Sequence, residues 1–171
     1  MGRKLRVGAA MACLLLLGSV TVASATSSRD NRSSGSDGRK VVVLDLMARA
    51  VGEPTIIDRK PTGLSQGDQQ VLAVDLLHAG TKLGEESSIC MVSRVEANGA
   101  STVHCTGVES LPGGQITTEG TINYGPNEFP KADPYSLAIK GGTGKYRTAH
   151  GEIRIQELTA TEWQITLRII L

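Results

Sequence analysis

The chain has 171 residues, of which 18 are lysine or arginine, 17 are aspartate or glutamate, and 40% are hydrophobic. This length suits a single domain with its own core. The formal net charge of +1 gives no surface excess that would follow a phosphate backbone, so nucleic acid is not an expected partner.

The N-terminus has the three parts of a signal peptide. Three basic residues precede an apolar run from Val7 to Val22, which ends in the small-residue pattern Ala23-Ser24-Ala25. A membrane anchor is the alternative, but the run is shorter than the ~20 residues that a spanning helix needs. We therefore predict a cleaved signal peptide over residues 1–25, a secreted protein and no stable membrane span after cleavage.

Cleavage leaves 146 residues with 15 basic and 17 acidic side chains. Residues 26–38 are polar and contain nothing that could join a core, so a disordered leader is predicted there. The folded domain is expected over residues 39–171.

Eight β-type runs follow, rich in Val, Ile, Thr and Leu and separated by turn signals such as Asn98-Gly99 and Leu111–Gly114. The runs are Lys40–Ala50, Gln69–His78, Ser87–Glu96, Ala100–Ser110, Gly114–Tyr124, Tyr135–Lys140, Ala149–Leu158 and Thr161–Leu171. The pattern predicts an all-β fold, namely a closed eight-stranded antiparallel β-barrel, which leaves no exposed edge. A two-sheet sandwich is the alternative, because periodicity does not separate the two.

Two cysteines, Cys90 and Cys105, remain after cleavage. If Asn98-Gly99 forms a two-residue loop, Cys105 lies two residues from the position opposite Cys90. A four-residue loop would place the two cysteines directly opposite each other. Both registers put the sulfur atoms on the same face, so a disulfide is predicted for an oxidising compartment, with two buried thiols as the alternative.

Known metal and phosphate motifs are missing from the sequence. The histidines His78, His104 and His150 have no ligand spacing with another histidine, cysteine or carboxylate, so no metal site is expected. The Gly141–Gly144 segment lacks the lysine of a phosphate-binding loop, and no serine-hydrolase elbow is present.

The remaining candidates for chemistry are acids inside apolar runs. Asp45 is flanked by apolar residues on both sides, and Asp75 is placed similarly. If Asp45 faces the lumen of a barrel, Val43 and Met47 line the cavity beside it, and the buried carboxyl could act as a general acid. The alternative is that each aspartate points outward or pairs with an arginine.

Two segments resemble the signatures of the allene oxide cyclase barrel-like superfamily, which includes the plant dirigent proteins. They are Gly114–Gly120 and Ser136–Glu152, the second of which contains Gly141-Gly142-Thr143-Gly144. Thr81–Gly84 and Ser88–Val92 resemble the allene oxide cyclase segment that precedes a cysteine, and Asp45 falls where the family has a first-strand acid.

The resemblance implies an eight-stranded barrel, often a homotrimer, with a hydrophobic lumen. Known members steer ring closure or coupling of a reactive apolar small molecule without a cofactor. Plant cyclases hold a water with asparagines and use a tyrosine, but the matching positions here are Met47, Val74 and Ile122. The plant reaction itself is therefore not expected. Arg147 resembles an arginine of the dirigent signature, whereas Ser136 stands where dirigent proteins carry an aspartate.

Together these observations predict a secreted cyclase or coupling guide for a hydrophobic small molecule. Asp45 would be the acid, with Tyr124 or Arg147 as supporting donors. The lumen would be lined by Val43, Met47, Val74 and Ile122. The alternatives are a non-catalytic carrier of an apolar ligand and a structural protein with a filled barrel.

The signal peptide gives the first testable prediction. Secreted protein should begin at or near Thr26, because cleavage follows the Ala23-Ser24-Ala25 pattern. N-terminal sequencing of exported material measures this directly, and an intact Met1 in the membrane fraction would contradict it.

Overall fold

The computed structural model describes residues 39–126 and 133–171. The predicted signal peptide and leader lie outside these residues. The described residues form nine β-strands and one short 3-10 helix. The first strands are β1 (Val41–Ala50), β2 (Thr55–Ile57), β3 (Gln69–His78), β4 (Thr81–Val95) and β5 (Ser101–Leu111). They are followed by β6 (Gly114–Tyr124), β7 (Tyr135–Gly142), η1 (Gly144–Tyr146), β8 (His150–Thr159) and β9 (Glu162–Ile170).

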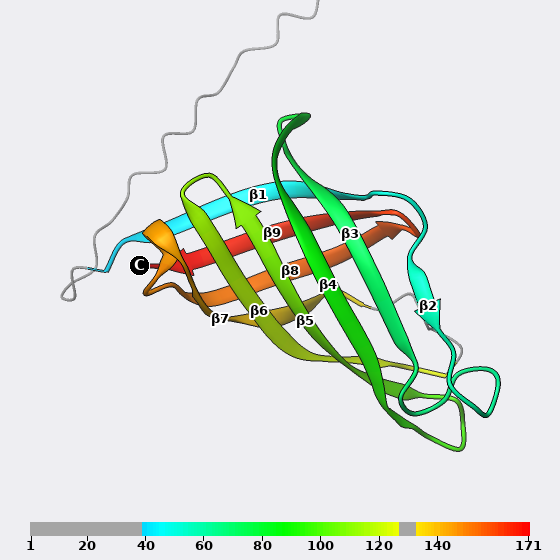
Figure 1. Ribbon diagram of the computed structural model, residues 1–171. Helices are drawn as coiled ribbons and strands as arrows, with labels where there is room; N and C mark the ends of the chain where they lie inside the picture. The colour runs from blue at the N-terminus through cyan, green and yellow to red at the C-terminus, as the bar shows by residue number, and fades with distance from the viewer. Residues whose placement is uncertain (1–38, 127–132) are drawn as a thin grey trace, which may run out of the picture. The chain divides into compact units, whose positions relative to one another are not determined.

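Eight of the described strands close into an antiparallel barrel. The sheet order is β1-β9-β8-β7-β6-β5-β4-β3-β2, and an additional pairing of β1 with β3 completes the ring. Figure 1 shows these strands wrapping around one interior, with β2 outside the ring against β3. The predicted eight-stranded barrel is confirmed. The short strand β2 escaped prediction because its three residues are too few to show a period.

The β4–β5 hairpin fixes the register of the two cysteines. Glu96 N–H donates to Ala100 O at 2.8 Å, so the loop holds three residues, and Gly99 has a positive φ of 86°. A bulge between Val92 and Arg94 then shifts the pairing by one residue. Cys90 therefore lies directly opposite Cys105, the register that a four-residue loop was expected to give.

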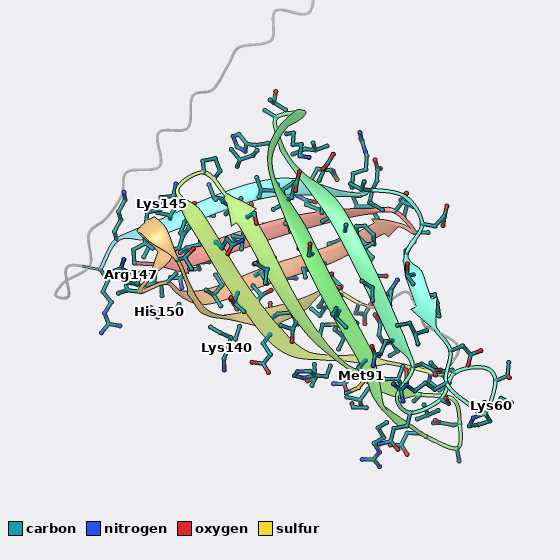
Figure 2. The ribbon with its side chains drawn as sticks, viewed as in Figure 1. Lys60, Met91, Lys140, Lys145, Arg147 and His150 are labelled. Atoms are coloured by element: carbon teal, nitrogen blue, oxygen red, sulfur yellow. A yellow bond between two sulfur atoms is a disulfide. The ribbon has the colours of Figure 1, made fainter. Side chains whose placement is uncertain are left out.

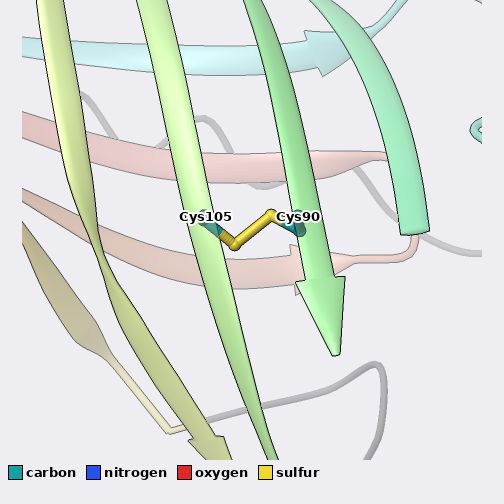
Figure 3. The surroundings of a disulfide bond; sticks show 2 residues. All are labelled: Cys90 and Cys105. Atoms are coloured by element: carbon teal, nitrogen blue, oxygen red, sulfur yellow. A yellow bond between two sulfur atoms is a disulfide. The ribbon is translucent and has the colours of Figure 1, made fainter. Parts of the chain in front are cut away.

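The predicted disulfide joins these two residues across β4 and β5 (Figure 3). The Cα atoms of Cys90 and Cys105 are 4.1 Å apart. Cys105 is buried and Cys90 partly buried, and both side chains belong to the inner face of the barrel.

The end of the barrel next to η1 is filled by side chains. The buried apolar residues that pack there are Leu46, Leu76, Leu111, Ile116, Ile139, Tyr146, Ile153, Leu167 and Ile169. They come from every strand of the ring except β4, where Gly84 lies on the inner face. A Cβ at Gly84 would lie 2.3 Å from the carbonyl oxygen of Ser110, so only glycine fits this contact. Among the described residues, no helix is long and apolar enough to cross a membrane.

Removing the disulfide should destabilise the barrel. The Cys90→Ala/Cys105→Ala variant releases a loop with a sequence separation of 15, and it should lose about 3 kcal/mol of unfolding free energy. Urea denaturation measures the loss. Thiol labelling of the unreduced mature protein should find no free cysteine, and two labelled thiols per chain would contradict the bond.

Candidate functional site

The other half of the barrel encloses a cavity of about 390 Å³. Most of its wall is apolar. The apolar lining residues are Ala48, Leu72, Val74, Ile122, Tyr124, Tyr135, Leu137, Ile155, Leu158, Ala160, Trp163 and Ile165, together with the disulfide. On every strand of the ring except β4, the next inward residue toward η1 is one of the buried residues of the filled end, so the cavity stops where that packing begins. On β4 this position is Gly84.

Two glutamates lie at the inner end of this cavity. Glu86 on β4 and Glu109 on β5 are directly opposite in the strand register, and both line the cavity. Glu109 is fully buried. Glu86 is the inward-facing residue next to Gly84 on β4, and Glu109 is the inward-facing residue next to Leu111 on β5. The pair therefore lies at the inner end of the cavity, against the filled half.

One oxygen of Glu109 is held and the other is not. Thr118 Oγ1 donates a hydrogen bond to Glu109 Oε1 at 2.9 Å. Glu109 Oε2 is buried and has no hydrogen-bond partner among the described residues. Gly107 provides the room for this arrangement, because a Cβ there would lie 2.8 Å from Thr118 Oγ1 and 3.4 Å from Glu109 Oε1.

The environment of the pair favours the protonated carboxyl. Burial raises the pKa of Glu109 to about 8, and the negative charge of Glu86 adds to the rise, while the Thr118 hydrogen bond opposes it. Burial also raises the pKa of Glu86, against the effect of a hydrogen bond with Ser88. At neutral pH Glu109 therefore holds a proton inside the cavity, which is a usable acid–base group.

The outer part of the cavity carries a second set of polar groups. Tyr124, Tyr135 and Glu157 line it, and burial raises the pKa of both phenols. Both tyrosines therefore stay protonated over the physiological range and can donate hydrogen bonds. Trp163, the only tryptophan of the chain, lies on the same wall.

A smaller hollow of about 240 Å³ adjoins the cavity and shares Tyr124, Gln70 and Cys90 with it. Its outer wall is the loop between β2 and β3, which Asp68 organises. The backbone N–H groups of Arg59 and Ser65 donate to the Asp68 carboxylate at 2.7 and 2.8 Å. These bonds, that of Arg59 first, hold the pKa of Asp68 below its usual range. The loop is therefore fixed beside the cavity.

The structure brings some of the sequence candidates into the cavity and leaves others outside. Val74, Ile122 and Tyr124 line it. Asp45 differs from expectation, because it is exposed on the outer face of β1, where Thr166 Oγ1 donates to its Oδ1 at 2.7 Å. Val43, 55% exposed, lies on the same face.

The prediction that Asp45, Val43 and Met47 face inward is thus wrong, because the inward-facing set of β1 is displaced by one residue along the strand. The even-numbered positions of β1 face inward, as the burial of Leu46 and Ala48 shows. The error arises because β1 has apolar residues at both odd-numbered and even-numbered positions. The alternation of apolar and polar residues therefore does not show which face is buried.

Arg147, the other expected donor, is exposed beside η1. Figure 2 shows it near Lys145 and His150 at the filled end of the barrel. β6 begins next to η1, and only its residues from Thr118 onward line the cavity. Arg147, which lies beside η1, is therefore at the opposite end of the barrel from the outer part of the cavity. The described part of the chain contains no group of three His, Cys, Asp or Glu side chains that could hold a metal ion.

Sequence reasoning missed the glutamate pair, although a signal for it was present. The register that places Cys90 opposite Cys105 also places Glu86 opposite Glu109, on the face of the two sulfur atoms. The strand was expected to begin at Ser87, however, and β4 begins at Thr81. This boundary left Glu86 outside the predicted sheet.

The buried acid makes the stability of the barrel depend on pH. The folded state binds the Glu109 proton more tightly than the unfolded chain, where the ordinary pKa is 4.5. The unfolding free energy should therefore fall as pH rises from 4.5 to 8, with each unit of pKa shift worth about 1.4 kcal/mol. Urea denaturation of wild type and Glu109→Gln across this window measures the effect.

The Glu109→Gln variant should show a flatter pH profile and a higher stability than wild type at pH 8, the pKa of Glu109. Glu85→Gln is the matched control, because Glu85 is the exposed neighbour of Glu86 on the outer face. Parallel profiles for wild type and Glu109→Gln would contradict the buried proton.

Solved structures share this barrel. Pyocyanin demethylase superposes with a TM-score of 0.65 at 20% identity, covering 75% of this chain and 99% of that chain. An exo-specific intermolecular Diels-Alderase gives 0.65 at 14% identity, covering 79% and 100%. A pterocarpan synthase dirigent protein gives 0.57 at 16% identity, covering 80% and 92%. At these identities the likeness concerns the fold.

No curated protein matches the chain in sequence. The family described as the allene oxide cyclase barrel like domain matches residues 53–171, from β2 to the C-terminus. The expected resemblance is therefore confirmed, and this chain belongs to the allene oxide cyclase barrel-like family.

Proposed function

We propose that this protein is an exported barrel that binds an apolar, reactive small molecule in its lumen and steers the cyclisation or stereoselective coupling of that molecule. The observation that carries the proposal is the carboxyl group of Glu109, which is buried at the inner end of a mostly apolar cavity and has one oxygen without a partner among the described residues. The family supports it, since structural neighbours of this chain include a Diels-Alderase and a dirigent protein.

The apolar walls would supply most of the rate effect. A cavity of about 390 Å³ holds a small molecule in few conformations, and a wall matched to one of them keeps the reacting atoms close. Binding also expels water, so any polar contact inside acts in a medium of low dielectric constant.

Glu109 would supply the polar contribution. Its protonated carboxyl would donate a hydrogen bond to a substrate oxygen on which negative charge develops during bond formation. If the proton transfers, the carboxylate that remains would take it back when the product forms, so no proton is consumed overall. Tyr124, on the same cavity wall, would act as a second donor, because burial keeps its phenol protonated.

The substrate is found by extraction and by fluorescence. Molecules that co-purify with the exported barrel are extracted and identified by mass spectrometry, and apolar compounds are then screened for quenching of Trp163. Because Trp163 is the only tryptophan and lines the cavity, its emission reports occupancy without a label.

Glu109→Gln should lower turnover of that substrate at saturation by about 10²-fold or more, the usual contribution of general acid catalysis. Glu85→Gln, which removes an acid from the outer face, should turn over like wild type. Unchanged turnover and product ratio in Glu109→Gln would instead indicate a carrier that uses only its apolar walls.

A further inference from the structure

Among the described residues that line the cavity, the charged side chains are all acidic. Glu86, Glu109 and Glu157 line it, and none of the described residues on its wall is a lysine, an arginine or a histidine. At the inner end of the cavity, an anionic ligand would meet the carboxyl groups of Glu86 and Glu109, and no described residue of the wall offers it a cationic partner. A neutral apolar ligand would leave two opposed carboxyl groups covered and deprived of water, which carries a desolvation cost.

One oxygen of the pair, Glu109 Oε2, has no hydrogen-bond partner among the described residues. The residue is fully buried, Thr118 satisfies Oε1 only, and no described residue donates to Oε2. The strand register aims Glu86 at the same inner end of the cavity. A positively charged group of the ligand would complete this site, and the aromatic side chains of Tyr124, Tyr135 and Trp163 on the wall favour a cation that is delocalised or alkylated.

We propose that the molecule bound in the lumen is an apolar cation, either a protonated amine or an alkylated heteroaromatic ring, whose positive charge lies against the Glu86–Glu109 pair. The proposal rests on the proposed function, whose ligand class it narrows. The cation would balance one ionised carboxylate of the pair. A pair that carries two protons before binding would release one of them to solvent, and a pair that carries one would release none. The proton that the pair retains remains available for acid–base chemistry.

Three bicyclic probes of similar size distinguish the contribution of ligand charge to binding from the contribution of apolar contacts. N-methylquinolinium is a permanent cation, 1-methylnaphthalene is its neutral isostere, and 1-naphthoate is the corresponding anion. Titration calorimetry of the intact mature protein should show the cation binding at least about tenfold more tightly than the neutral probe, with no detectable binding of the anion.

The proton exchange gives a second readout. Calorimetry in buffers of different ionisation enthalpy should show up to one proton released per bound N-methylquinolinium near pH 7, and none for 1-methylnaphthalene. Cation affinity should rise with pH up to the pKa of Glu109, about 8. The titratable groups that share the cavity with Glu109 are Glu86 on β4, Tyr124 on β6, Tyr135 on β7 and Glu157 on β8. Because the probe itself does not titrate, the released proton comes from this set.

Variants assign the effect to the pair. Glu86→Gln and Glu109→Gln should each reduce the preference for the cation toward unity while still binding 1-methylnaphthalene, which shows that they fold. Glu85→Gln, on the outer face, should keep the wild-type preference.

Equal binding of the cation and its neutral isostere would overturn the charge proposal and leave the apolar lumen standing. A cation preference that survives in both glutamine variants would also overturn it, because the charge would then be recognised elsewhere. Failure of all three probes to bind would count against ligand binding in the cavity, and so against the proposed function as well.

Discussion

The register between β4 and β5 is the constraint on which the interior depends. Because Cys90 faces Cys105, every inward residue of one strand meets an inward residue of the other, and Glu86 meets Glu109. The disulfide prevents a slip of one residue between the strands, which would turn the side chains of one strand over and take one of the two glutamates out of the cavity. Gly107 keeps the space beside Glu109 free of a side chain. A covalent bond between two strands thus also sets the position of the acids.

Placing two carboxyl groups opposite each other in the barrel interior costs free energy, and the structure shows what lowers that cost. Two ionised carboxylates without a counter-charge would be strongly unfavourable in this interior, by several kcal/mol per ion. Protonation removes most of that cost, and the Thr118 hydroxyl satisfies one oxygen of Glu109. What remains is an oxygen, Oε2, that has no hydrogen-bond partner among the described residues, and an acid whose pKa lies far above its ordinary value. Packing alone gives no reason for this arrangement, since an apolar side chain would fill the same place without penalty.

The sequence predicted the architecture better than the site, for reasons that particular strands illustrate. β9 alternates apolar and polar residues, so the alternation alone predicted that Trp163, Ile165 and Leu167 share its inward face. β1 is apolar on both faces, and its orientation is set by pairing with β9 and β3, which no local pattern shows. Glu86 was missed for another reason: the polar stretch at the start of β4 reads as a loop, and only tertiary pairing extends the strand through it.

Because of the orientation of β1, the acidic side chains that face the cavity come from other strands. Its inward residues Leu44, Leu46 and Ala48 are apolar, so the first strand brings no acid to the lumen. Cys90 is held in the disulfide, which removes it as a nucleophile or a hydrogen-bond donor. The acidic groups left at the inner end of the cavity are therefore those of β4 and β5, two neighbouring strands tied together covalently. Because β4 and β5 are hydrogen-bonded along their length and joined by the disulfide, we expect the spacing of the two carboxyl groups to change little when other parts of the barrel move. That rigidity suits a site whose proton must stay fixed while the surrounding apolar wall adapts to the ligand.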